Sequence, residues 1–206
     1  MTKSRTKPKP AFIETEIKLP VEDDDLKKIR RRLKRLGFRL SRRRVHEDNY
    51  LFDFADRRLR RRGRLLRLRF VGGKSLLTFK GPAGKGPAGG KGPYKTRTEL
   101  EFAVRDGKAF RQVIEIIGLN VSFRYEKYRT TFSEEGSGKR HRGAVAVLDE
   151  TPIGNFLELE GPPGWIDRVA QGLGYRKKDY ISASYATLYR LDCRRKRRKA
   201  GHMVFR

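Results

Sequence analysis

The sequence predicts an α+β protein whose main element is an eight-stranded antiparallel β-barrel, closed and flanked by helices. About eight stretches alternate apolar with polar residues, as strands do, and only two or three stretches have helical spacing. In addition, charged residues of both signs recur on one face of most of the expected strands. If the sheet closes, those faces line a polar lumen and the apolar faces pack outward against the helices.

The first eighty residues predict one helix and four strands. A strand at Ala11–Leu19 precedes a helix at 22–36, in which Leu26, Ile29 and Leu33 recur at helical spacing behind an acidic start. A glycine ends that helix, and a long strand follows it. The other strands of this part are expected at Phe38–Phe54, Arg64–Val71 and Ser75–Lys80, with a tight hairpin at Gly72 and Gly73.

The rest of the chain predicts four more strands and the remaining helical segments. KGPAG occurs at 80–84 and again at 85–89, within a Gly/Pro-rich stretch at 81–93 that is typical of a flexible connector. Strands are expected at Lys95–Val104, Phe123–Phe132, Ala144–Glu150 and Gly154–Glu160, with a loop at 134–143. Helical segments are expected at Asp106–Gly118, with Asp106 as the cap, at Pro163–Gly172 and over 182–190.

The charge of the chain is strongly positive and unevenly distributed. Lys and Arg number 51 against 24 acidic residues, which gives a formal charge of +27. Residues 1–10 carry +4 and residues 190–206 carry +7, so we expect two flexible basic arms beside a folded body at 11–189. Such an excess favours an anionic partner, which is a nucleic acid, a membrane surface or a phosphorylated small molecule.

Several classes of protein and of site are excluded. No apolar run approaches the roughly 18 residues needed to span a bilayer. A single cysteine, Cys193, rules out an internal disulfide and a cysteine-based zinc site, and fits a reducing, cytoplasmic location. The three histidines lack the spacing of a metal site and are interpreted as surface residues: His46, His141 and His202.

The charged residues of the expected strands lie at positions i and i+2, which share a face. One such strand is ordinary, because an antiparallel sheet often has a solvated face, but seven strands repeat the pattern with both signs. The acidic set is Glu14, Glu16, Glu99, Glu101, Asp149, Glu158 and Glu160, and the basic set is Lys18, Arg67, Arg69, Lys80, Arg97, Lys127 and Arg129. Clustered carboxylates suit hard ions such as Mg²⁺ or Mn²⁺, while Arg and Lys bind phosphate oxygens. The lumen therefore predicts a metal-bridged polyphosphate ligand.

A series of short motifs follows in order across residues 11–189. They are ETEIK (14–18), YLFDF (50–54), LLRLRF (65–70), LTFKGP (77–82), TRTELEF (96–102), EKYRTTF (126–132), VLDE (147–150), NFLELEG (155–161) and SYATLY (184–189). The first fits the ExExK signature of the CYTH superfamily, the triphosphate tunnel metalloenzymes, and the whole series resembles that superfamily. Among its branches, the series looks most like the class IV adenylate cyclase-like and thiamine triphosphatase group.

The resemblance implies an eight-stranded antiparallel barrel, the triphosphate tunnel, that binds a triphosphate with one or two divalent ions, Mg²⁺ or Mn²⁺. The metal ligands that it implies are Glu14, Glu16, Glu158 and Glu160, with Glu99 or Glu101 assisting. The triphosphate-binding residues that it implies are Lys18, Arg67, Arg69, Lys80, Arg97, Lys127 and Arg129. It also implies catalytic roles for Lys18, Lys80 and Asp149, the last as a further carboxylate near the metal or the attacking group.

Two activities share such a lumen and stay open at this point. In a cyclase, the ribose 3′-hydroxyl of ATP attacks the α-phosphorus and pyrophosphate leaves. In a triphosphatase, water attacks the terminal phosphorus of tripolyphosphate or of an organic triphosphate such as thiamine triphosphate. A hypothesis from another class is a non-catalytic module that binds nucleic acid or polyphosphate, with weak nucleic-acid contact through the basic tail at 190–206. It leaves the carboxylates unexplained, because they share strand faces with the cations and repel a nucleic acid.

Overall fold

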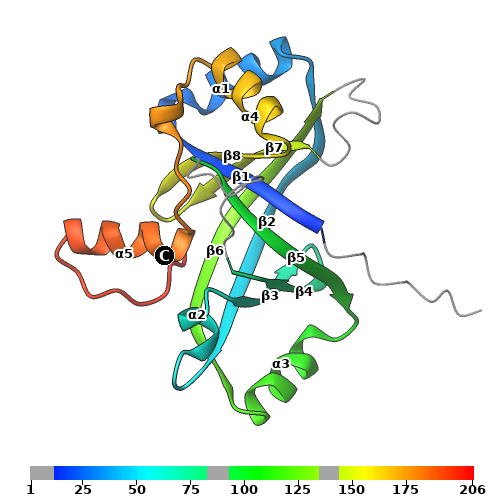
Figure 1. Ribbon diagram of the computed structural model, residues 1–206, viewed down its shortest axis with the longest axis vertical. Helices are drawn as coiled ribbons and strands as arrows, with labels where there is room; N and C mark the ends of the chain where they lie inside the picture. Colours follow the sequence, from blue (N-terminus) through cyan, green and yellow to red (C-terminus); the bar gives the residue numbers. More distant parts are fainter. Residues whose placement is uncertain (1–11, 83–92, 135–143) are drawn as a thin grey trace, which may run out of the picture.

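Eight antiparallel strands close into a barrel in the computed structural model, which describes residues 12–82, 93–134 and 144–206 (Figure 1). The strands are β1 (Phe12–Val21), β2 (Phe38–Phe54), β3 (Leu65–Val71), β4 (Lys74–Lys80), β5 (Lys95–Val104), β6 (Leu119–Glu134), β7 (Val145–Thr151) and β8 (Gly154–Glu160). Around the barrel they follow the order β1-β5-β4-β3-β2-β6-β7-β8. The predicted fold class is confirmed. The arm at 1–10, most of the KGPAG-containing stretch and His141 lie outside the described residues.

The helices of the described residues differ from the predicted ones mainly at the start of the first helix and at the end of the last one. They are α1 (Leu26–Arg35), α2 (Arg58–Arg61), α3 (Gly107–Ile116), α4 (Pro163–Gly172) and α5 (Tyr185–Arg195), with 3₁₀ turns at Asp23–Asp25 and Lys177–Asp179. Asp106 caps α3 as predicted, because its carboxylate accepts a hydrogen bond from the amide of Ala109. The acidic start expected for the first helix is a separate 3₁₀ turn, and α2 was not predicted. No helix of the described chain is long and apolar enough to cross a membrane.

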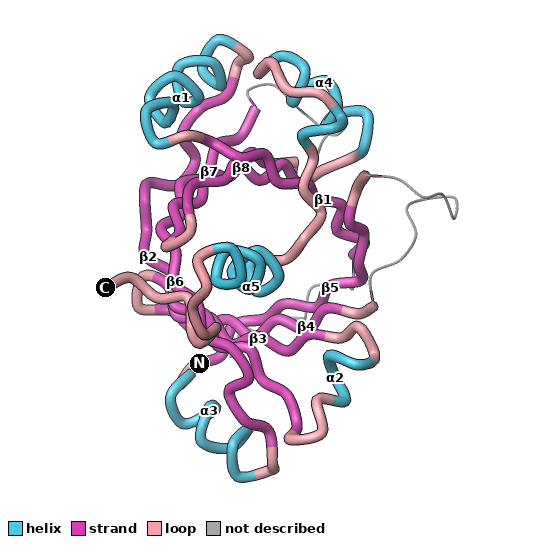
Figure 2. Tube along the Cα trace, turned by 90° about the vertical axis from the view of Figure 1, so that its left-hand side faces the viewer, coloured by secondary structure: helices cyan, strands magenta, loops and turns pink. Residues whose placement is uncertain are grey.

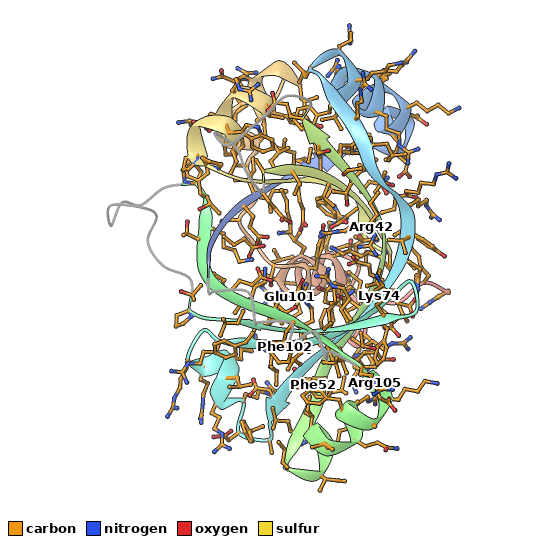
Figure 3. All side chains as sticks on the ribbon, turned by 90° about the vertical axis from the view of Figure 1, so that its right-hand side faces the viewer. Arg42, Phe52, Lys74, Glu101, Phe102 and Arg105 are labelled. Atoms are coloured by element: carbon orange, nitrogen blue, oxygen red, sulfur yellow. The ribbon has the colours of Figure 1, made fainter. Side chains whose placement is uncertain are left out.

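The apolar faces of the strands point outward and pack under the helices, as the alternation predicts. The main core joins β1, β7 and β8 to α1 and α4, with Ile17, Leu33 and Ile166 fully buried or nearly so. A second core, which includes Leu68 and Ile114, lies between β2, β3, β4 and α3. Outward packing leaves the inner faces of the strands to the charged residues. In Figure 3, Glu101 and Phe102 of β5 point to opposite sides of their strand, the former into the lumen.

The C-terminal segment is packed against the barrel, which corrects the expectation of a tail without a core of its own. Helix α5 continues to Arg195, so Cys193 is 1% exposed in a cluster with β6 residues. Beyond the helix, Met203 is 0% exposed and pairs with β6. Its amide donates to the carbonyl of Arg124 at 2.9 Å, and its carbonyl accepts from the amide of Glu126 at 2.8 Å. This segment therefore holds α5 in place across one end of the barrel (Figure 2).

A substitution at Met203 tests this docking. Met203→Asp places a charge where the side chain is fully buried, so we expect the last residues to detach while the barrel stays folded. Hydrogen exchange followed by mass spectrometry should show loss of protection at Met203 and Glu126. The exposed Lys199→Ala change is the control and should leave protection unaltered. Equal protection in wild type and Met203→Asp would show that the tail is not held through this side chain.

Candidate active site

Strand register places residues of opposite charge side by side inside the barrel. Across β1 and β8, Lys18 lies opposite Glu158, and across β1 and β5, Glu14 lies opposite Arg97. Across β6 and β7, Arg129 lies opposite Asp149. Because side chains of an aligned pair are about 5 Å apart at their Cβ atoms, the register alone creates a charged lumen. The alternation of charged and apolar residues along each strand had predicted that these residues share one face of the sheet.

The lumen is a cavity of about 1050 Å³ that reaches α5, the helix that crosses one end of the barrel in Figure 2. Of the predicted site residues, all except Asp149 line it. These are Glu14, Glu16, Lys18, Arg67, Arg69, Lys80, Arg97, Glu99, Glu101, Lys127, Arg129, Glu158 and Glu160. From α5, Ser184, Tyr185, Ala186, Thr187 and Arg190 line it as well. The predicted set therefore faces one space, which is large enough for a drug-sized ligand.

Three carboxylates of this set lie close enough together to share a cation. One oxygen from each of Glu14, Glu16 and Glu160 lies within 4.8 Å of the other two. Burial, together with the carboxylates of Glu16 and Glu160, raises the pKa of Glu14 to about 8, although Lys80 opposes this. Burial likewise raises the pKa of Glu160. Crowded oxygen ligands of this kind are what Mg²⁺ and Mn²⁺ bind, so the residues present fit a divalent metal ion.

Lys80 and Lys95 form ion pairs with two carboxylates of this triad. The ammonium of Lys80 lies 2.5 Å from Glu14 and 3.0 Å from Glu99, and the ammonium of Lys95 contacts Glu16. Burial opposes ionisation of Glu16, but Lys18 and Lys95 hold its pKa well below its usual range. The triad thus contains one carboxylate whose pKa is lowered, Glu16, and two whose pKa values are raised, Glu14 and Glu160.

Lys18 is buried among anions and carries a firm positive charge. It is 2% exposed, and its ammonium lies 3.1 Å from Glu158 and 3.5 Å from Glu16. Burial disfavours the charge, but these two carboxylates hold the pKa of Lys18 above its usual range. A lysine in this state positions anions and cannot accept a proton at neutral pH. The geometry therefore suits an electrostatic role for Lys18.

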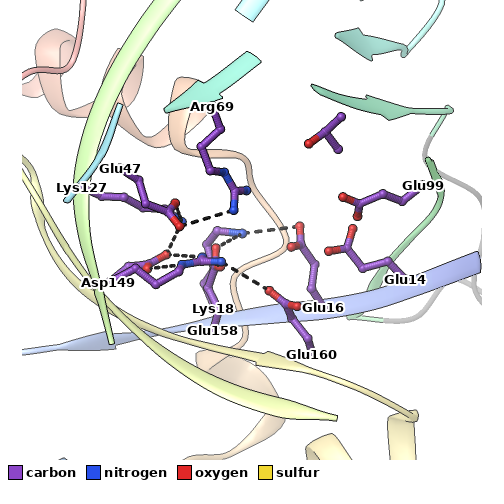
Figure 4. A network of polar contacts seen from close by, with 12 residues as sticks. Glu14, Glu16, Lys18, Glu47, Arg69, Glu99, Lys127, Asp149, Glu158 and Glu160 are labelled. Carbon is purple, nitrogen blue, oxygen red and sulfur yellow. Dashed lines mark hydrogen bonds and ion pairs between the residues drawn. The ribbon is translucent and has the colours of Figure 1, made fainter. Parts of the chain in front are cut away.

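Asp149 is the centre of a buried network behind the cavity (Figure 4). Its carboxylate accepts hydrogen bonds from Lys127 at 2.7 Å, from Arg129 at 2.6 and 2.7 Å, and from the Tyr185 hydroxyl at 2.8 Å. The residue is 0% exposed and does not line the cavity. The structure therefore places Asp149 where it orients Lys127 and Arg129, and not in contact with the space that a ligand can occupy.

Two of the lumen arginines keep buried donors that have no partner in the described chain. The Nε atoms of Arg67 and Arg97 are buried and unbonded, although other nitrogens of both side chains are engaged. Arg67 donates to the Tyr125 hydroxyl at 3.3 Å and to Thr78 at 3.1 Å, and Arg97 donates to the Gly63 carbonyl at 3.5 Å. Buried donors without acceptors are costly, so an anion bound in this cavity would stabilise both guanidinium groups.

The remaining predicted carboxylates do not all join the triad. Glu99 lies beside it, bound to Lys80. Glu158 lies two residues before Glu160 on β8, where it contacts both Lys18 and Arg129. Glu101 is set apart, because it accepts from Thr78 at 2.8 Å and lies 3.6 Å from Arg67.

Sequence reasoning missed several lumen residues. Glu47 is 0% exposed and lies 3.3 Å from Arg69 and 3.7 Å from Lys127. Burial opposes its ionisation, but Lys127 and Arg129 hold the pKa of Glu47 at about 2. Also missed were Lys95, Asn49, Tyr125 and Tyr185. Adding Glu47 and Lys95 keeps the lumen charges equal in number, eight of each sign.

Comparison with known proteins identifies the family of this fold and site. Residues 13–185 match the CYTH domain family. The chain belongs to the CYTH family. Members of this family bind triphosphates and use divalent metal ions, which agrees with the carboxylate triad and the cations of the lumen.

One relative in sequence and two solved structures illustrate the similarity. A Methanocaldococcus jannaschii protein, provisionally named an adenylate cyclase, is 32% identical over 149 residues, which are 72% of this chain and 77% of that protein. A Vibrio parahaemolyticus structure with the same provisional name has a TM-score of 0.69 at 18% identity, over 85% of this chain and 97% of that one. A Hippeastrum structure has a TM-score of 0.57 at 18% identity, over 91% and 97%. That protein is described as a provisionally assigned adenylyl cyclase with a dominant triphosphatase activity.

Proposed function

We propose that this chain is a divalent-metal-dependent enzyme that cleaves the phosphate chain of a triphosphate in the barrel lumen. One observation carries the proposal. The triad of Glu14, Glu16 and Glu160 faces the same cavity as the cations, and two arginines there keep unbonded buried donors. A binding site for anions alone has no use for a carboxylate triad, whereas a metal–triphosphate complex uses both parts.

The roles of the side chains follow from their positions. Glu14, Glu16 and Glu160 would hold the metal ion, with Glu99 beside them, and Glu158 would anchor Lys18. A bound Mg²⁺ or Mn²⁺ neutralises phosphate charge and polarises the phosphorus–oxygen bonds. The cations would bind phosphate oxygens, Arg by paired hydrogen bonds and Lys as point charges: Lys18, Arg67, Arg69, Lys80, Arg97, Lys127 and Arg129. Lys80 would sit between metal ligands and phosphate, which fits a contribution to charge neutralisation at the reacting phosphorus.

The first candidate reaction is the conversion of ATP to cyclic AMP and pyrophosphate. The Methanocaldococcus relative carries a provisional adenylate cyclase name. The cavity of about 1050 Å³ also exceeds what three phosphates fill, and apolar side chains line part of it, among them Leu51, Val121 and Phe123. Those features leave space for the nucleoside of ATP.

The second candidate reaction is hydrolysis of the triphosphate, and the Hippeastrum structure favours it. That protein shares the fold and is described as dominantly a triphosphatase despite its cyclase name. The lumen residues serve either reaction, because both place the phosphate chain between the same cations and the same carboxylates.

Product analysis tests the proposal and separates the two reactions. Purified protein is incubated with ATP, tripolyphosphate or thiamine triphosphate in the presence of Mg²⁺ or Mn²⁺, and cyclic AMP, pyrophosphate and orthophosphate are measured. Cyclic AMP with pyrophosphate from ATP identifies a cyclase, and orthophosphate identifies a triphosphatase. Absence of turnover of all three compounds with either metal would overturn the proposal.

A further inference from the structure

The cavity extends beyond the charged lumen to a group of arginines at its mouth. Arg57, Arg60 and Arg64 from α2 and its flanks, and Arg190 from α5, line the same cavity as the metal triad. We call these four residues the arginine rim. Helices α2 and α5 lie on the same side of the barrel (Figure 1), so the rim lies on that side of the cavity.

The rim arginines have no carboxylate partner among the described residues, unlike their neighbours. Arg61 pairs with Asp56 at 2.9 Å, and the guanidinium of Arg58 lies over the Phe54 ring at 3.4 Å. Arg57, Arg60 and Arg64 form no ion pair within the described chain. Arg190 donates only within its own helix, to Ala186 and Thr187. Like charges gathered without anions repel one another, so the rim is a site at which a bound anion lowers the electrostatic energy.

The backbone around α2 determines where the rim arginines lie. Arg57 adopts a left-handed conformation with φ 57°, which is costly for a residue with a side chain. Asp53 lines the same cavity beside these arginines. Its carboxylate already accepts hydrogen bonds from the amides of Phe54, Leu59 and Arg60 at 2.8 to 3.0 Å. Its negative charge therefore fixes α2 and leaves the side chains of Arg57 and Arg60 for the cavity.

Arg97 links the lumen to the rim. Its Nη2 reaches the Gly63 carbonyl at 3.5 Å, one residue before Arg64, and its buried Nε has no acceptor among the described residues. Unsatisfied guanidinium groups thus continue from the lumen toward the opening. Inside the lumen, acidic and basic side chains are equal in number, whereas along the rim four arginines accompany one acidic residue, Asp53.

We propose that the arginine rim is a second anion subsite, which binds the part of a phosphate chain that extends beyond three phosphates. The inference rests on the proposed function, because the first phosphates must occupy the lumen. The ligand class is a phosphoanhydride chain longer than a triphosphate, either inorganic or attached to a nucleoside. A triphosphate bound in the lumen leaves no phosphate group outside it, so only a longer chain places phosphate groups at the rim.

Calorimetric titration against chains of increasing length tests the subsite. The ligands are tripolyphosphate, tetrapolyphosphate, a longer inorganic polyphosphate and adenosine tetraphosphate, each with and without Mg²⁺. We expect wild type to bind the longer chains more tightly than tripolyphosphate. The variant Arg60→Ala/Arg64→Ala/Arg190→Ala should lose about tenfold in affinity for the longer chains and little for tripolyphosphate, because each exposed contact contributes roughly 0.5 kcal/mol.

A matched variant on α1, Arg31→Ala/Lys34→Ala/Arg35→Ala, removes the same charge from exposed positions that do not line the cavity. It should bind every ligand as wild type does. Equal losses for tripolyphosphate and for longer chains, or equal losses in both variants, would mean general attraction of anions and would overturn the subsite. If adenosine tetraphosphate bound more tightly than tripolyphosphate but tetrapolyphosphate did not, the rim would contact the nucleoside, and the proposed phosphate subsite would be overturned. Failure of tripolyphosphate itself to bind would instead remove the proposed function.

Discussion

The double variant Glu14→Gln/Glu16→Gln should lose at least about a thousandfold in turnover of the preferred triphosphate, which corresponds to roughly 4 kcal/mol of transition-state stabilisation. Glutamine keeps the size of both side chains and removes two negative charges from the carboxylate triad, where one oxygen from each residue lies within 4.8 Å of the others. Neutral amides bind Mg²⁺ and Mn²⁺ far more weakly than carboxylates. Kinetic assays and calorimetric titration with Mn²⁺ measure the two losses.

The sharpest control for this variant lies in the same lumen. Glu101→Gln also removes a carboxylate of β5 that lines the cavity, but Glu101 contacts Thr78 and Arg67 and stands apart from the triad. We expect it to keep its metal affinity. If Glu101→Gln lost Mn²⁺ binding as completely as the double variant, or if the double variant still bound Mn²⁺ as wild type does, the triad would not be the metal site.

Alternation along strands was enough to predict the barrel and most of the charged residues that line its lumen, because a period of two assigns every residue of a strand to one of two faces. In β1 one face carries Glu14, Glu16 and Lys18, and the other carries residues such as Ile17, so the inner face could be recognised. In β2 both faces carry an acidic residue. The structure turns Glu47 inward and pairs Asp48 with Arg124, and the local sequence does not distinguish those two outcomes.

The other unpredicted features depend on contacts between distant segments. Helix α2 has no apolar periodicity, and it starts where it does because the Asp53 carboxylate accepts hydrogen bonds from its first amides. The C-terminal tail has the composition of a solvated arm, yet Met203 pairs with β6 almost eighty residues away. Tyr185 lies in α5, and its hydroxyl reaches Asp149 inside the barrel, a contact that only the closed fold creates.

Asp149→Asn should lower the free energy of unfolding by about 3 kcal/mol, the lower end of the range for breaking a buried ion pair. The change is nearly isosteric, but it removes the charge that Lys127 and Arg129 share at 2.6 to 2.7 Å in a site where Asp149 is 0% exposed. Glu47 and Glu158 still neutralise part of the charge of these two cations, which is why we expect the lower end. Urea denaturation measures the change.

Tyr185→Phe provides the comparison that separates the charge of this network from its packing. It deletes only the hydroxyl that donates to Asp149 at 2.8 Å and keeps the ring that lies 5.2 Å from both Lys18 and Lys127. One net hydrogen bond contributes about 1 kcal/mol, so the loss should be about a third of that in Asp149→Asn. Turnover should fall strongly in Asp149→Asn, since Lys127 and Arg129 lose the group that orients them toward the cavity. An Asp149→Asn protein as stable and as active as wild type would show that Glu47 and Glu158 suffice to position both cations, and Asp149 would then have no role in the site.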